Sequence, residues 1–175
     1  LDRSIALYRA IGSIPGESLA IGSRAMLFHE RWRLAEAEQG YDRALSMLEG
    51  RAPQRVAWLF LAARAALRAF EVDGSVAEVD IDRAFRECQA LSAPGLCSAI
   101  GVWRGHFEVA RACRALCNHE LETARTHLID AHRTIESVPD DHLRYDEVRL
   151  AVRILRRVVG IAGREPLLLG EELAW

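Results

Sequence analysis

Three arginines of this sequence stand at a fixed distance from a repeated alanine. Arg24, Arg64 and Arg111 each precede their alanine by 13 residues, and these alanines are Ala37, Ala77 and Ala124. The guanidinium group of arginine binds a carboxylate or a phosphate through two parallel hydrogen bonds. The repeated spacing therefore predicts a row of anion-binding side chains along one surface. Arg24, Arg64 and Arg111 are called the arginine row below.

Two neighbours of the arginine row extend this prediction. Arg68 lies on the same predicted helix as Arg64, and so does Trp58. An exposed Trp beside an Arg is a good anchor for a peptide, whereas most Trp residues of a repeat are part of the core. The candidate binding residues are therefore Arg24, Arg64, Arg68, Arg111 and Trp58. The alternative is that each arginine pairs with Glu or Asp inside its own unit and only holds the helices together.

No set of residues in the sequence indicates a chemical reaction. GxSxG, HExxH and glycine-rich phosphate loops are all missing from it, and these are the motifs that would indicate hydrolysis or nucleotide binding. The six histidines do not lie near Ser or Cys at a spacing typical of an activated nucleophile. We therefore predict a protein that is not an enzyme, with no catalytic residue and no cofactor.

Cys113 and Cys117 come nearest to a metal-binding pattern. They lie four residues apart on one predicted helix, and His119 follows them. Cys97 or His106 would have to complete a tetrahedral set of ligands. The sequence contains no CxxC motif, and small thiols at helical spacing are typical of a core-facing surface. We predict buried structural cysteines and no metal.

Composition and charge exclude several further classes of protein. The chain has 175 residues, half of them hydrophobic, and a net charge of −2. These values fit one domain or one short solenoid. A near-neutral charge without a dense basic run argues against direct nucleic-acid binding by this segment, and no apolar run is long enough to cross a membrane. The four cysteines do not form a secreted disulfide pattern, so the predicted location is the cytoplasm.

A short phrase recurs along the chain. It reads LDRS at residues 1–4, YDRA at 41–44 and IDRA at 81–84, with a looser copy, LIDA, at 128–131. An alanine upstream completes a small–large–small triplet whose spacing of four and then three places the side chains on one face of a helix. A helix with such a face can nest closely against two neighbours. The triplets are Ala37–Tyr41–Ala44, Ala77–Ile81–Ala84 and Ala124–Leu128–Ala131.

Prolines mark the boundaries between the units. Pro15, Pro53, Pro94 and Pro139 each follow one of these helices, and proline is well tolerated in the first turn of a helix. We predict helices at about 1–11, 15–30, 33–49, 53–72, 75–91, 95–118, 120–137 and 140–160. The third unit is seven residues longer than the others, and its glycines predict a break or kink near residues 92–105.

The pattern of paired helices resembles the tetratricopeptide repeat, whose period is about 34 residues. The period here is 40 or more, so the helices are longer, and the Ile21–Gly22 pair is similar to the Leu-Gly pair of that family. The resemblance implies an all-α, right-handed superhelical stack of antiparallel helix pairs, a tetratricopeptide-like α-solenoid. It would cover residues 1–162, in units at about 1–14 (partial), 15–52, 53–93, 94–138 and 139–162 (partial). Residues 163–175 would form a linker or a capping tail.

Long units of this kind resemble those of bacterial signalling and transcription regulators, including the maltose-activator type. The tail at residues 166–175 is similar to the lead-in to the ATPase domain of enhancer-binding activators of the sigma-54 class. Because the chain starts at Leu1 rather than Met, we expect a fragment of such a regulator. This inference is by analogy of fold.

The predicted function is that of a non-catalytic regulatory domain that binds a protein or peptide segment. An acidic segment would suit the arginine row, and self-association is a further option. The alternative is a sensor domain that binds a small anionic effector on an arginine-lined concave face.

Overall fold

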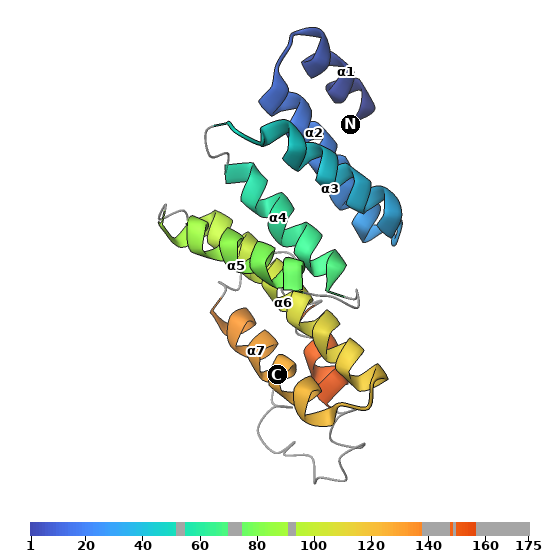
Figure 1. Ribbon diagram of the computed structural model, residues 1–175, viewed down its shortest axis with the longest axis vertical. Helices are drawn as coiled ribbons and strands as arrows, with labels where there is room; N and C mark the ends of the chain where they lie inside the picture. The colour runs from blue at the N-terminus through green and yellow to red at the C-terminus, as the bar shows by residue number, and fades with distance from the viewer. Residues whose placement is uncertain (52–54, 70–74, 91–93, 138–147, 149, 157–175) are drawn as a thin grey trace.

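The computed structural model describes residues 1–51, 55–69, 75–90, 94–137, 148 and 150–156, and every regular element within them is a helix (Figure 1). Val148 and residues 150–156 are helical as well. The all-α prediction is thereby confirmed for the described part of the chain. The predicted tail at 163–175 lies outside it. The helices are α1 (Asp2–Ala10), α2 (Ile14–Glu30), α3 (Leu34–Leu48), α4 (Arg55–Arg68), α5 (Ser75–Ala90), α6 (Pro94–Cys117) and α7 (Leu121–Glu136).

Local sequence signals set the helix boundaries. Ser13 caps α2 by accepting a hydrogen bond from the backbone N–H of Gly16, and Pro15 lies in the first turn. Pro94 is the first residue of α6. Pro53 and Pro139, the other two predicted boundary prolines, lie outside the described residues.

α6 is one continuous helix from Pro94 to Cys117, so the predicted break in the third unit does not fall inside it, and residues 92 and 93 lie outside the described part of the chain. Within α6, Gly105 serves close packing. A Cβ atom added to Gly105 would lie 3.0 Å from a methyl group of Val148 and 3.2 Å from the side chain of Ile135. The glycine thus lets two apolar neighbours approach the helix, and the helix does not need to bend there.

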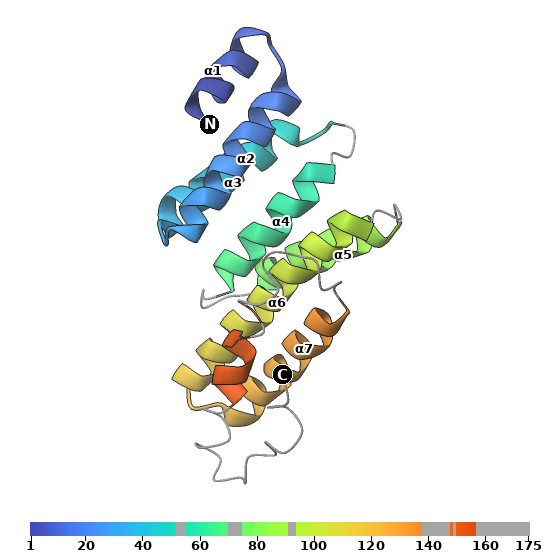
Figure 2. The same cartoon turned by 180° about the vertical axis from the view of Figure 1, so that it is seen from behind.

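Consecutive helices pack against each other along the whole chain, from α1 on α2 to α6 on α7. Each unit pairs a first helix (α2, α4 or α6) with a second helix (α3, α5 or α7). The first helices also touch across units, α2 with α4 and α4 with α6, whereas among the described residues no second helix contacts another second helix. Figures 1 and 2 show the resulting elongated stack from its two sides.

The alanine triplets form the seams of this stack. All nine triplet side chains are 2 % exposed or less, which confirms their predicted burial. Gly22 is needed for the same reason, because a Cβ atom at that position would lie 2.1 Å from the ring of Phe60 on α4. Small side chains therefore let the helices approach, and one large side chain between each pair of alanines fills the space that remains.

Within the described part of the chain, no helix is both long and apolar enough to cross a membrane.

Candidate functional site

The side chains of the arginine row reach neighbouring helices, where each meets a carboxylate. Arg24 on α2 pairs with Asp2 on α1. Arg64 on α4 donates to Asp42 of α3 at 2.7 Å and to Asp80 of α5 at 2.5 Å. With 15 % of its side chain exposed, Arg64 is held between two carboxylates.

Arg68 and Arg111 have different surroundings. Arg68 donates to Glu38 at 2.7 Å and to Asp42 at 3.0 Å, so it belongs to the same network as Arg64. Arg111 donates to Glu78 of α5 at 3.5 Å, and its guanidinium carbon lies 5.7 Å from the centre of the Phe107 ring. The structure thus brings Arg64 and Arg68 together around Asp42 and leaves Arg111 elsewhere.

Most of these ion pairs cross from one unit to the next. Asp2, Asp42 and Glu78 all lie on the second helix that precedes the arginine, and only Asp80 lies in the same unit as its arginine. The alternative of pairing inside one unit therefore fits the Arg64–Asp80 contact alone. The arrangement is one that holds adjacent units together.

A second spacing, which sequence reasoning missed, describes these contacts better. The aspartate of the repeated phrase precedes its arginine partner by 22 residues in the pairs Asp2–Arg24, Asp42–Arg64 and Asp82–Arg104. The third pair has an N–O distance of 3.2 Å. The signal was present in the sequence, because the aspartate is part of every complete copy of the phrase.

The three tryptophans of the described helices and turns have contrasting environments. Trp58 and Trp103 are each 5 % exposed and lie in the core. The ring of Trp103 stacks on that of His29 with centroids 5.2 Å apart. Trp32 is 79 % exposed. Of these three residues, the one placed to meet a partner is therefore Trp32 rather than Trp58, the predicted candidate.

Trp32 sits in the turn between α2 and α3 with a backbone φ of +58°. Its N–H donates to the carbonyl of His29 at 3.0 Å, and the N–H of Arg33 donates to that of Phe28 at 2.9 Å. This pair of bonds is the Schellman motif, which ends a helix with one residue in the left-handed conformation. The same motif after α1 places Gly12 there, with φ of +68°.

A left-handed backbone costs a residue with a side chain about 1–2 kcal/mol relative to glycine. The molecule therefore spends stability at the turn. The same turn joins α6 to α7, where His119 has a φ of +63°. The left-handed backbone therefore belongs to the helical hairpin, and what distinguishes Trp32 is a large apolar side chain that is 79 % exposed.

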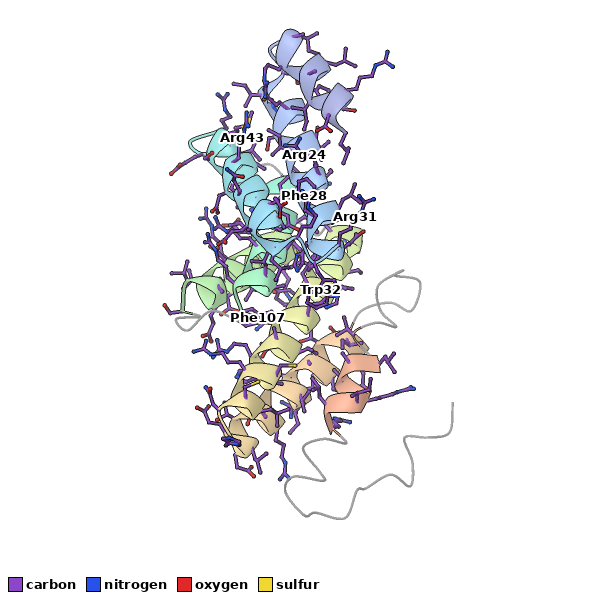
Figure 3. The ribbon with its side chains drawn as sticks, turned by 90° about the vertical axis from the view of Figure 1, so that its right-hand side faces the viewer. Arg24, Phe28, Arg31, Trp32, Arg43 and Phe107 are labelled. Carbon is purple, nitrogen blue, oxygen red and sulfur yellow. The ribbon has the colours of Figure 1, made fainter. Side chains whose placement is uncertain are left out.

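Basic and apolar groups surround Trp32 (Figure 3). Arg31 is exposed, and its side chain has no ion pair within the described part of the chain. The guanidinium carbon of Arg33 lies 4.4 Å from the centre of the Phe28 ring, and its nitrogens bond to Glu36. Leu27 is 41 % exposed. The residues Leu27, Phe28, Arg31, Trp32 and Arg33 are called the Trp32 surface below.

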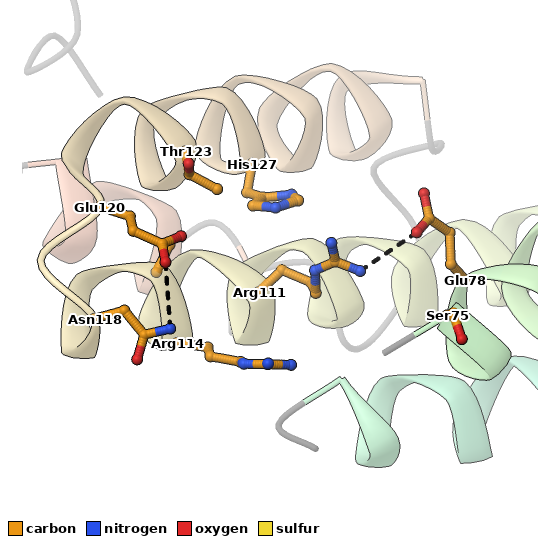
Figure 4. A pocket seen from close by; sticks show the side chains of 9 residues that line it. Ser75, Glu78, Arg111, Arg114, Asn118, Glu120, Thr123 and His127 are labelled. Atoms are coloured by element: carbon orange, nitrogen blue, oxygen red, sulfur yellow. Dashed lines mark hydrogen bonds and ion pairs between the residues drawn. The ribbon is translucent and has the colours of Figure 1, made fainter. Parts of the chain in front are cut away.

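A hollow of about 310 Å³ lies between α5, α6 and α7 (Figure 4). Arg111 and Arg114 of α6 line it, with Glu78 of α5 and His127 of α7. His127 Nδ1 is 2.7 Å from Glu108 Oε2, and both side chains are largely buried. Ser75, Ala115, Asn118, Glu120 and Thr123 complete the lining.

The cysteines are only partly as predicted. Cys88 is buried, which raises the pKa of its thiol to about 12, but Cys113 is half-buried and Cys117 is exposed. The prediction that all are buried is wrong for Cys117, because it falls at the solvent-exposed end of α6. In the part of the chain that the structure describes, no three His, Cys, Asp or Glu side chains are grouped to hold a metal ion.

Comparison with known protein families, curated proteins and solved structures gives no match. The geometry described above is therefore the basis for any functional assignment.

Proposed function

We propose that this protein is a non-catalytic helical repeat domain that binds another protein, and that Trp32 is the anchor of its binding surface. The observation that carries the proposal is an indole 79 % exposed on a left-handed backbone. Strain of this kind persists where function requires it. Clustered aromatic and arginine side chains are the usual centres of protein interfaces.

Energies support Trp32 as an anchor. Burying a tryptophan removes about 150–250 Å² from water, which is worth about 4–6 kcal/mol at 25 cal/mol per Å². Even after the exposed fraction is allowed for, this gain exceeds the 1–2 kcal/mol of the left-handed backbone. The exposed indole is thus unfavourable for the free protein, and its burial in a complex would be favourable.

The packing pattern supports a right-handed superhelix whose inner side is formed by α2, α4 and α6. These first helices touch each other, whereas the second helices are separated, as expected on the outer side of a curved stack. The His29–Trp103 contact joins the last turn of α2 to α6, two units away. A contact between helices two units apart is what strong curvature of the stack would produce. Trp32 follows His29 by three residues, so it lies beside this contact.

The chemistry of the Trp32 surface indicates the kind of segment that would bind. Arg31 is a cation without a partner in the described part of the chain, and Leu27 and Trp32 are apolar. A segment with an apolar side chain for the indole and a nearby carboxylate for Arg31 would satisfy both. Resemblance to the long helical units of bacterial regulators supports a regulatory role in the cytoplasm for this binding.

The test selects binding peptides from a random displayed library and compares them on three variants. Trp32→Gly removes the anchor and relieves the left-handed backbone, so it should melt at the same or a higher temperature and lose binding roughly tenfold or more. Val79→Ala is the matched control, because Val79 is 63 % exposed but lies on α5. It should bind as the wild type does.

Arg31→Gln should weaken binding mainly at low salt, because an exposed charge acts through screened attraction. Selected peptides that bind Trp32→Gly as tightly as the wild type would refute the assignment of this surface. A library that yields no binder to the wild type would refute peptide binding itself.

A further inference from the structure

A second site lies in the hollow between α5, α6 and α7. We propose that this hollow binds a small anion that carries both an oxyanion group and a hydroxyl group, with Arg111 as the main contact of the oxyanion. The volume of about 310 Å³ is at the lower end of the range of small-molecule pockets. The proposal is independent of the protein-binding function.

Arg111 differs from Arg64 in the carboxylates that pair with its guanidinium group. Arg64 has two carboxylates at 2.7 and 2.5 Å, and both of them are fixed on neighbouring helices. Among the described residues, the carboxylate that meets Arg111 is that of Glu78, at 3.5 Å, and the Glu78 side chain is 59 % exposed. The guanidinium carbon of Arg111 also lies 5.7 Å from the centre of the Phe107 ring. An ion pair of 3.5 Å with an exposed partner is weak, so an incoming anion can replace Glu78.

The extra length of the third unit explains why Arg111 is available. Arg104 follows Asp82 by 22 residues and makes the contact between units with it. Arg24 and Arg64 make the same contact with Asp2 and Asp42. Arg111 follows Arg104 by seven residues, which is about two helical turns on the same face. Arg104 therefore makes the contact between units, and Arg111 lines the hollow.

The other lining groups define the ligand. Arg114 lies one turn beyond Arg111 and adds positive charge. His127 directs Nδ1 at Glu108, 2.7 Å away, and its ring lines the hollow. The Glu120 carboxylate, which Asn118 contacts at 3.5 Å, accepts hydrogen bonds and suits the hydroxyl group of a ligand. Sugar phosphates and hydroxy acids share this chemistry.

Isothermal titration calorimetry in a low-salt buffer without phosphate would test the site with three probes. Glycerol 3-phosphate and L-malate carry an oxyanion and a hydroxyl group, and inorganic phosphate lacks the carbon frame. We expect at least one of the first two to bind at millimolar concentration or tighter, and more tightly than inorganic phosphate. Preference for glycerol 3-phosphate or for malate distinguishes the phosphate from the carboxylate class.

Variants with opposite expected effects make the test decisive. Arg111→Gln should weaken binding roughly ten- to hundredfold, as expected for loss of a charge-assisted hydrogen bond. Glu78→Gln removes the competitor for Arg111 and should strengthen binding. Arg133→Gln is the control, because Arg133 is 75 % exposed on α7 and away from the hollow.

Three results would overturn the proposal: no heat with any probe, equal binding by Arg111→Gln and the wild type, or weaker binding by Glu78→Gln. Trp32→Gly, in contrast, should bind the anion as the wild type does. Failure of the hollow and failure of the Trp32 surface are therefore separate outcomes.

Discussion

Asp80 and Asp82 allow the contribution of the inter-helix ion pairs to be measured against an internal control. Both aspartates lie on α5, two residues apart, and each faces an arginine of a first helix. Asp80 meets Arg64 at 2.5 Å with side chains 13 % and 15 % exposed. Asp82 meets Arg104 at 3.2 Å with 41 % and 29 % exposed. Changing either residue to Asn removes one negative charge from the same helix.

The two substitutions should differ in cost because of burial. Arg64 keeps Asp42 at 2.7 Å when Asp80 is changed, so the guanidinium retains a partner. The loss is then one charge-assisted hydrogen bond, about 2 kcal/mol of the free energy of unfolding. The partly exposed Asp82 pair should contribute about 0.5 kcal/mol. For a chain of this size, 1 kcal/mol corresponds to about 2–4 °C in Tm.

Urea unfolding followed by circular dichroism at 222 nm, with thermal melts of the same samples, would measure both changes. Salt separates them further, because an exposed pair is screened and a largely buried one is not. The loss in Asp82→Asn should therefore vanish in concentrated NaCl, while that in Asp80→Asn persists. Equal losses for the two variants, or a loss in Asp80→Asn that disappears with salt, would refute the argument from burial.

Two further substitutions test the close packing of the stack, each by urea unfolding. Ala84→Leu should cost about 1–3 kcal/mol by overpacking, since Ala84 is fully buried, whereas Ala90→Leu on the exposed end of the same helix should change little. Gly22→Ala should destabilise, although alanine favours a helix by about 1 kcal/mol, because its Cβ would lie 2.1 Å from the Phe60 ring. Gly95→Ala, which meets nothing within 4 Å, should stabilise instead; stabilisation by both substitutions would show that helix propensity outweighs packing at Gly22 and would refute the argument.

The helices and their buried faces could be predicted from the sequence because both depend on local spacing. An alanine, a large residue and a second alanine at helical intervals form one face wherever the helix lies. The burial of Tyr41, Ile81 and Leu128 at 2 % or less follows from that pattern. The starts of α2 and α6 followed from Pro15 and Pro94 for the same reason.

The exposure of Trp32 could not be predicted in this way. A tryptophan in a chain that is half hydrophobic is most often part of the core, as Trp58 and Trp103 are. The position of Trp32 depends on where α2 ends, and a left-handed turn is usually indicated by Gly or Asn. The segment Arg31–Trp32–Arg33 has neither, so the sequence carried no signal for the turn that exposes the indole.

The arginines show most clearly how a repeat can mislead. In the first two units, one arginine satisfies two spacings at once: Arg64 follows Asp42 by 22 residues and precedes Ala77 by 13. In the third unit the seven additional residues separate the two spacings. Arg104 keeps the first, and Arg111 keeps the second. A count based on alanines therefore selects Arg111, whereas the contact between units is made by Arg104.

Because seven residues make nearly two turns, both arginines stay on one face of α6. A longer unit thus retains the stacking contact and also gains a cation beside the hollow.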